Sequence, residues 1–132
     1  MGLLTRMEEA VEHFETALVD KVFRHEPVEV LDALRRECDD HVLVVSEERR
    51  LAPNAYLVEL AGPVHDRLDS QEAGVCQELT DELVRHAAER GYDFPGPVAV
   101  HLTRTDTLPN GRYRISSAAS ENLPAALFTA GT

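Results

Sequence analysis

Apolar residues recur at helical spacing over the first part of the chain and predict an amphipathic helix. Its apolar stripe consists of Leu4, Met7, Val11, Phe14, Leu18 and Val22. Thr5 and Glu8 have the spacing of a capping box, which places the start of this helix. The stripe must be buried against the core, a partner helix or a membrane surface. The acidic polar face argues against an anionic lipid surface.

A second helix is expected from Pro27 to about Cys38, because proline is favoured in a first turn and the acidic residues after Cys38 oppose the helix dipole. Its buried face is expected to consist of Val28, Leu31 and Leu34, with Val30 and Ala33 beside it. Residues 41–46 are apolar and β-branched, and they predict a buried strand. Residues 47–50 are charged and predict a turn.

Alternation of apolar and polar positions marks residues 51–60 as the central strand of a sheet. One face of this strand is expected to carry Tyr56, Val58 and Leu60, and the other Leu57 and Glu59. We interpret Pro53 and Asn54 as fixing the entry and register of the strand rather than as part of a site. The short polar link before this segment predicts an antiparallel hairpin with residues 41–46.

Two further helices are expected in the second half of the chain. Residues 64–68 predict one or two helical turns, and residues 71–90 predict a longer helix. Asp69 and Ser70 are expected to cap the longer helix, and Gly91 to end it. The buried stripe of this helix is expected to be Cys76, Leu79, Leu83 and Ala87, flanked by Val75 and Val84.

Strands expected over residues 98–102 and 112–116 complete an α+β fold, in the order α-α-β-β-α-α-β-β. This order indicates a small mixed sheet of about four strands with helices packed on one face. Between the last two strands, Asn110-Gly111 is a strong turn signal. Residues 1–116 are expected to form a single α+β domain, and residues 117–132 a flexible tail or the start of a linker.

The β-α-α-β part of this order also occurs in KH-type RNA-binding domains, where a Gly-x-x-Gly loop clamps the nucleic-acid backbone. Here the corresponding junction, residues 68–74, is acidic and contains no Gly-x-x-Gly. A KH-like β-α-α-β core therefore remains a structural alternative, and a degenerate KH-like nucleic-acid-binding domain remains the alternative function.

The 132-residue chain has a formal net charge of −11, which disfavours a nucleic-acid partner because phosphate contacts need clustered Lys and Arg. No apolar run is long enough to cross a bilayer, and the N-terminus does not resemble a signal peptide. A cytoplasmic protein without a transmembrane segment is therefore expected. Cys38 and Cys76 fall on helical patterns and are expected to be packed free thiols.

Candidate chemistry is sparse. None of the six histidines has zinc-ligand spacing with a carboxylate or a cysteine. Cys76 with His65 or His86 would resemble a Cys–His pair, but no nucleophile turn is present. His41 and His101 fall on expected strands, where a cross-strand contact between them would be pH-sensitive. We expect no catalytic, cofactor-binding or metal site and no enzymatic activity, since a hydrolase would need a deep pocket with a perturbed titratable group.

Several segments, in their order and spacing, resemble one known family over residues 1–116. They are the Met1-Gly-Leu-Leu4 start with its amphipathic helix, Val22-Phe23, residues 27–37, residues 51–60, His86-Ala-Ala-Glu-Arg-Gly-Tyr92, Gly96-Pro-Val-Ala-Val100 and Asn110-Gly-Arg-Tyr-Arg114. The chain resembles the N-terminal domain of FhaA-type proteins, which are actinobacterial scaffolds that carry a forkhead-associated (FHA) domain at their other end.

The resemblance implies a non-enzymatic protein-interaction or regulatory module in Ser/Thr-kinase signalling linked to cell-wall synthesis and division. Its expected partners are proteins, such as a Ser/Thr kinase or the cell-wall and division machinery, and no cofactor is expected. In such scaffolds the FHA domain reads phosphothreonine, and these 132 residues contain no FHA domain. The N-terminal domain can itself be a kinase substrate, so the candidate phosphorylation sites near the last turn are Thr103, Thr105, Thr107 and Ser116.

Overall fold

The fold is α+β, as the sequence predicts. It is seen in a computed structural model that describes residues 16–24, 27–108 and 112–120. The helices are α2 (Ala17–Val22), α3 (Pro27–Asp40), α4 (Gly62–Asp66) and α5 (Glu72–Arg90), with a 3-10 turn η1 (Asp69–Gln71) before α5. The strands are β1 (Leu43–Val44), β2 (Arg50–Leu51), β3 (Ala55–Ala61), β4 (Ala99–Thr105) and β5 (Tyr113–Ala118).

The described strands form a three-stranded sheet in the order β4-β3-β5 and a separate two-stranded ribbon of β1 and β2. The expected sheet of about four strands is thus divided in two. Strand β3 is central and pairs in parallel with β4, because α4, η1 and α5 carry the chain back to the starting edge. On its other side β3 pairs antiparallel with β5.

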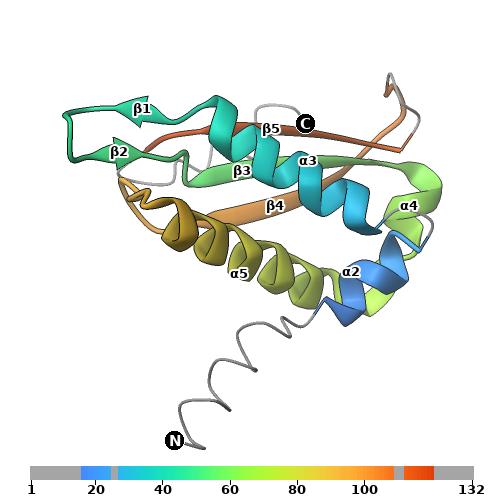
Figure 1. The fold of residues 1–132 in the computed structure, drawn as a ribbon. Coiled ribbons are helices and arrows are strands. Elements are labelled where there is room, and N and C mark those ends of the chain that lie inside the picture. Colours follow the sequence, from blue (N-terminus) through green and yellow to red (C-terminus); the bar gives the residue numbers. More distant parts are fainter. Residues whose placement is uncertain (1–15, 25–26, 109–111, 121–132) are drawn as a thin grey trace, which may run out of the picture.

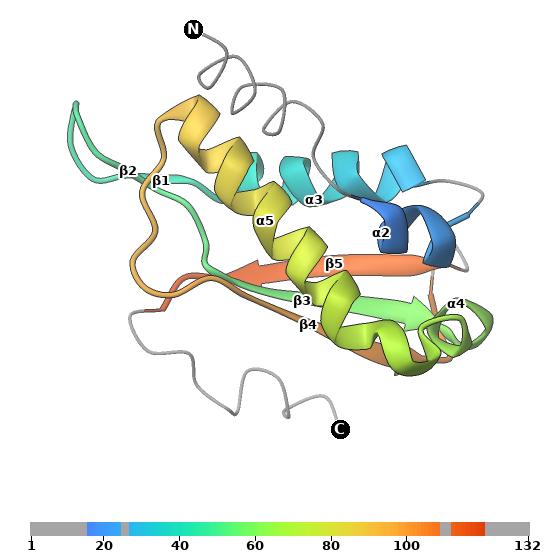
Figure 2. The ribbon, with the colours of Figure 1, turned by 90° about the horizontal axis from the view of Figure 1, so that it is seen from below.

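The helices α2, α3 and α5 lie on one face of the three-stranded sheet (Figures 1 and 2). The face of β3 toward the helices carries Tyr56, Val58 and Leu60, all fully buried, which confirms the alternation predicted from the sequence. Leu34 of α3 and Leu79 and Leu83 of α5 are also fully buried in this core. The opposite face of the sheet is partly exposed along all three strands.

Asn54 lies directly before β3 and fixes the start of this strand through hydrogen bonds. Its side-chain amide donates to the carbonyl oxygens of Pro97 (2.8 Å) and Ser120 (2.7 Å), and its Oδ1 accepts from the backbone N–H of Ser120 (2.8 Å). Its backbone bonds to Ala118 and Ala99 as well. These contacts join the starts of β3 and β4 to the end of β5, which gives Asn54 the register role predicted for it.

Helix α3 buries a face that is shifted from the predicted one and shares Leu34 with it. Its buried residues are Val30, Leu34 and Cys38, while Val28 is 66% exposed. These buried residues are four positions apart and form the stripe that faces the sheet and α5. Several apolar positions of α3 could be buried, and only this packing selects among them. The helix also continues to Asp40, two residues past its expected end.

The segment predicted as a buried strand, residues 41–46, is exposed apart from Val42, which is half-buried against the core. Only Leu43 and Val44 are in a strand, with 61% and 71% exposure, because the β1–β2 ribbon projects past the end of the main sheet and none of the described helices covers it (Figure 1). The hairpin is real but pairs β1 with β2, Leu43 opposite Leu51, and not with the central strand.

The two histidines proposed as cross-strand neighbours are not paired with each other. His41 follows α3, where its ring meets the carbonyl oxygen of Glu37 at 3.0 Å, whereas His101 on β4 lies opposite Leu57. The predicted neighbourhood was wrong because residues 41–46 do not join the sheet that contains β4.

Helix α5 ends as predicted, with Gly91 in the left-handed conformation at φ 74°. Leu79, Leu83 and Ala87 are buried, but so are Glu82 and His86, which the predicted stripe leaves out. Val84 is 48% exposed. The predicted cap is replaced by the turn η1, and neither α5 nor η1 has a side-chain cap hydrogen bond.

Part of the first predicted helix lies outside the described residues, as does most of the predicted tail. The described part, α2, buries Val19 and Val22. At the other end, β5 continues to Ala118, two residues past the predicted strand. Within the described ranges, no helix combines the length and the apolar character needed to cross a membrane.

Candidate functional site

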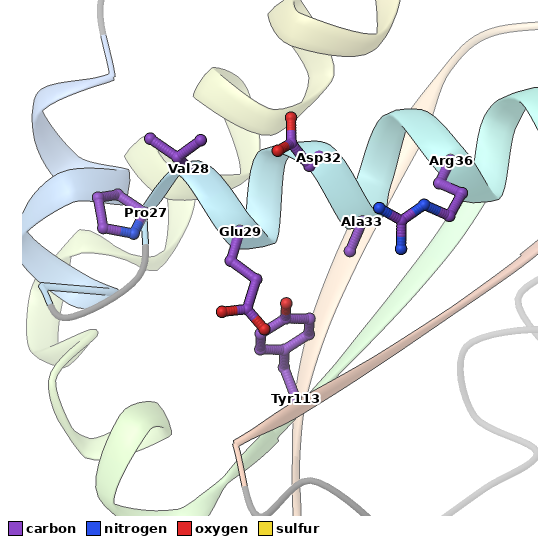
Figure 3. A pocket seen from close by; sticks show the side chains of 7 residues that line it. All are labelled: Pro27, Val28, Glu29, Asp32, Ala33, Arg36 and Tyr113. Carbon is purple, nitrogen blue, oxygen red and sulfur yellow. The ribbon is translucent and has the colours of Figure 1, made fainter.

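A groove runs along the outer side of α3, beside the edge strand β5. Its first hollow, of about 470 Å³, is lined by Pro27, Val28, Glu29, Asp32, Ala33, Arg36 and Tyr113. An adjoining hollow of about 360 Å³ shares four of these residues and continues along α3 to Asp40 and along β5 to Ile115. Figure 3 shows Glu29 reaching from α3 toward the ring of Tyr113 on β5, with Arg36 farther along the helix.

The floor of the α3–β5 groove is apolar and fixed. Tyr113 is only 7% exposed, and its ring packs edge-on against Phe23 with a centroid separation of 6.2 Å. Val28, at 66% exposure, is the most accessible apolar side chain on the groove wall. An exposed valine beside an anchored aromatic ring suits an apolar side chain of a partner.

The rim of the α3–β5 groove is acidic. Its four carboxylates, Glu29, Asp32, Glu37 and Asp40, outnumber its two guanidinium groups, Arg36 and Arg114. Arg112 pairs with Glu29 at 3.0 Å, and the Ser117 hydroxyl donates to Glu37 at 2.7 Å, so α3 is tied to β5 across the groove. A groove with this rim favours a partner segment that carries basic side chains.

A second group of polar side chains is buried between α3 and α5. Asp39 Oδ1 accepts a hydrogen bond from the Tyr92 hydroxyl at 2.9 Å and meets His86 Nε2 at 2.8 Å. Burial alone would raise the pKa of Asp39, but the hydrogen bonds from His86 and Tyr92, with the charges of His86 and Arg90, hold that pKa below its usual value. His86 itself is 3% exposed.

Cys38 and Tyr56 extend this group into the core. Both side chains are fully buried. Burial raises the pKa of the Cys38 thiol, and burial together with the nearby thiol raises the pKa of Tyr56. The Tyr56 hydroxyl nevertheless has no partner with hydrogen-bond geometry among the described residues.

Beside this group, Glu82 is a buried carboxylate with two cationic partners. It is 2% exposed and forms ion pairs with Arg35 of α3 and Arg85 of α5. Sequence reasoning missed Glu82, and it considered His86 only as a possible partner of Cys76, whereas the structure places the His86 ring against Asp39. The α3 partner of Glu82 is Arg35, and that of His86 is Asp39. Each partner lies 47 residues earlier in the chain, and no local pattern signals a pair at that distance.

The candidate phosphorylation sites lie at the open face and end of the sheet. Thr103 and Thr105 have the opposite parity to the buried Val100 and Leu102 on β4, and Ser116 the opposite parity to the buried Tyr113 on β5, so all three face away from the helices. In the register, Thr103 lies opposite Glu59, Thr105 opposite Ala61 and Ser116 opposite Leu57. Thr107 is exposed and follows β4 outside any strand. The structure thus brings three of the four onto one surface.

Comparison with known proteins agrees with the resemblance read from the sequence. A family model described as "FhaA, N-terminal domain" matches residues 4–116. The "FHA domain-containing protein FhaA" of Mycobacterium tuberculosis is 32% identical over 93 residues, which cover 67% of this chain and 17% of that protein. The chain therefore spans about a sixth of the length of this curated relative.

A solved structure named "Rv0020c_Nter structure" has the same fold. It superposes with a TM-score of 0.71 at 24% sequence identity, covering 83% of this chain and 84% of that one. The agreement in fold, together with the family match over residues 4–116, shows that the chain belongs to the FhaA N-terminal domain family.

Proposed function

We propose that this domain is a non-enzymatic protein-interaction and regulatory module of an FHA scaffold, acting in Ser/Thr-kinase signalling linked to cell-wall synthesis and division. Membership of the FhaA N-terminal family supports the scaffold role. The observation that carries an interaction role is the α3–β5 groove, with its anchored Tyr113, exposed Val28 and acidic rim. We place the protein in the cytoplasm, where its two free cysteines would stay reduced.

The partner of the α3–β5 groove is a protein segment with an apolar anchor and basic side chains. The anchor would lie against Val28 and Tyr113, and the basic groups would meet the carboxylates of Asp32, Glu37 and Asp40. Rim charges chiefly affect the rate of association and its dependence on salt. Binding should therefore weaken as the salt concentration rises.

Site-specific cross-linking in cells tests the groove. A photo-reactive residue at position 28 should capture a defined protein partner, whereas the same residue at Val84, an exposed valine on α5, should not. Adding Asp32→Lys to the position-28 variant should reduce capture, and Asp81→Lys on α5 is the matched charge control. Equal capture from positions 28 and 84, or capture unaffected by Asp32→Lys, would count against the groove.

We also propose that phosphorylation regulates the module, with Thr107 as the preferred acceptor. A kinase needs its acceptor hydroxyl in an accessible segment, and Thr107 is exposed and outside the strands. Thr103, Thr105 and Ser116 are held in the sheet by pairing with β3, and the two threonines are half-buried.

Incubation with a Ser/Thr kinase and ATP, followed by mass spectrometry, tests this assignment. Thr107→Ala should remove most of the incorporated phosphate, and Thr103→Ala should leave it nearly unchanged. Phosphate that stays on Ser116 or Thr103 in the Thr107→Ala protein would reassign the acceptor. The interaction role of the groove would stand in either case, because Thr107 does not line it.

A further inference from the structure

Three metal-ligating side chains converge where the C-terminal turn of α3 meets the last turns of α5. They are Cys38, Asp39 and His86, and one ligand atom of each lies within 4.8 Å of the other two. Cys38 and His86 are buried and Asp39 is half-buried. The set combines a thiol, a carboxylate and an imidazole, and it is one that sequence spacing cannot reveal, because His86 comes 47 residues after Asp39.

The spacing of the three atoms suits a small tetrahedral ion. Zinc binds sulfur at about 2.3 Å and nitrogen or oxygen at about 2.0–2.2 Å, so neighbouring ligand atoms of a zinc site lie about 3–4 Å apart. Atoms already within 4.8 Å reach that spacing with side-chain adjustments of about 1 Å. Thiolate and imidazole together favour zinc over magnesium or calcium, which prefer oxygen ligands.

The Tyr56 hydroxyl gives a separate indication of a ligand here. It is fully buried and faces the Cys38 thiol, but the contact falls short of hydrogen-bond geometry in the described parts of the chain. A buried hydroxyl that faces only a weak thiol acceptor of poor geometry is incompletely satisfied. A metal-bound Cys38 thiolate is a strong acceptor at that position, and its charge would attract the Tyr56 hydrogen. Tyr92 in turn holds the Asp39 carboxylate through its own hydroxyl.

We propose that Cys38, Asp39 and His86 bind a zinc ion that joins α3 to α5. Binding releases the Cys38 thiol proton to solvent. His86 binds through Nε2 as neutral imidazole with its proton on Nδ1, so the His86–Asp39 hydrogen bond gives way to one bond from each residue to the metal. A water molecule completes the tetrahedral set.

A solvent-filled hollow of about 420 Å³ provides the entry path, since it reaches Asp39 and His86 from the surface. Its wall carries four arginines and four carboxylates, so the path has no large net charge to repel a cation. Glu82 already engages two of those arginines, Arg35 and Arg85.

Titration of the chelator-treated, reduced chain with zinc and cobalt tests the proposal. We expect one zinc per chain, a higher unfolding temperature with zinc, and a sulfur-to-cobalt charge-transfer band with cobalt. Cys38→Ser should remove that band, and it should weaken zinc binding at least tenfold, as should His86→Gln. Cys76→Ser removes the other thiol and should bind both metals like the unaltered chain.

Two results would overturn the proposal. One is an unfolding temperature unaffected by zinc together with no sulfur–cobalt band. The other is a cobalt band that survives Cys38→Ser or disappears with Cys76→Ser. Circular dichroism of each variant without metal separates loss of binding from loss of folding. Cys38→Ser changes only sulfur to oxygen, so it keeps the test valid if His86→Gln does not fold.

Discussion

At the scale of single residues, the interior of this domain combines tight apolar packing with a few polar groups in demanding positions. Tyr56 is the clearest case, because its ring occupies the centre of the core while its hydroxyl lies buried beside Cys38. The sequence predicts the burial of Tyr56 from alternation alone. It cannot predict the surroundings of the hydroxyl, since these depend on the C-terminal turn of α3, which comes from another part of the chain.

Ring and hydroxyl of Tyr56 should therefore contribute differently to stability. Tyr56→Ala should lower the free energy of unfolding by about 3 kcal/mol, because it leaves a large cavity in a close-packed core. Tyr56→Phe should change it by less than about 1 kcal/mol in the presence of a chelator, because the lost hydroxyl makes no hydrogen bond of good geometry with the described residues. Urea denaturation measures both. A Tyr56→Ala protein of unchanged stability would contradict the central place of this residue.

The Cys76 thiol should react slowly with alkylating reagents. Burial, followed by the charge of Glu72, raises its pKa to about 11 from 9.0. Because the thiolate is the reactive form, alkylation at pH 8 should be about 100-fold slower in the folded than in the unfolded chain. The raised pKa also means that Cys76 favours the folded state fully below pH 9, and that this contribution is lost as the pH rises toward 11. Mass spectrometry of iodoacetamide-treated Cys38→Ser protein measures the rate, and equal rates in both states would contradict the assignment.

At the scale of elements, the sequence predicts an element well where one periodic pattern coincides with one buried face. The central strand β3 and the C-terminal end of α5 are of this kind. The face of α3 was wrong because Val28, Val30, Leu31 and Leu34 allow more than one stripe, and only contact with β3 and α5 selects Val30, Leu34 and Cys38. The buried pairs of Glu82 and His86 lay beyond prediction for a related reason, since their partners belong to α3.

The hydrogen bonds of the Asn54 side chain should contribute measurably to the free energy of unfolding. Asn54→Ala removes three side-chain bonds that join the three strands of the sheet, and should cost about 3 kcal/mol at about 1 kcal/mol each. Asn54→Asp should cost more, because it places a carboxylate against the carbonyl oxygens of Pro97 and Ser120. Chemical denaturation ranks the two, and an Asn54→Asp protein more stable than Asn54→Ala would contradict this account.

Gly91 should matter through its backbone alone. A Cβ atom at this position would meet no atom of the described residues within 4 Å, so the cost of Gly91→Ala comes from φ 74° and should be about 1 kcal/mol. Gly91→Asn is the matched control, because asparagine tolerates the left-handed region better. Thermal or urea unfolding should therefore rank the three proteins as Gly, Asn, Ala, and an alanine variant as stable as the original would contradict the cap.

At the scale of the whole molecule, the fold and the family follow from the sequence more completely than the surfaces do. The α+β class and the FhaA N-terminal resemblance are both confirmed. The α3–β5 groove could not be predicted, because it exists only where a helix and an edge strand from opposite halves of the chain meet. Its acidic rim agrees in sign with the net charge of −11.

That charge leads to a prediction that separates the two functional alternatives. The β3-α4-α5-β4 unit has the element order of a KH core, but η1 between its helices contains Asp69 and is followed by Glu72. We expect no binding of single-stranded RNA or DNA even at about 50 mM salt, where phosphate contacts are strongest. A gel-shift or filter-binding assay measures this, and saturable binding that falls steeply with added salt would favour the KH-like alternative.

The placement of β3 between β4 and β5 also has a consequence for how the protein is made. The central strand is synthesised first, but its neighbours begin 44 and 58 residues later, at Ala99 and Tyr113, counted from Ala55. A nascent chain that has emerged only as far as α5 thus holds a strand with both edges open, and the last contact of Asn54 waits for Ser120. Closure of the sheet on the ribosome is therefore expected only after residue 120 has left the exit tunnel, and until then both edges of β3 are open to pairing with other chains.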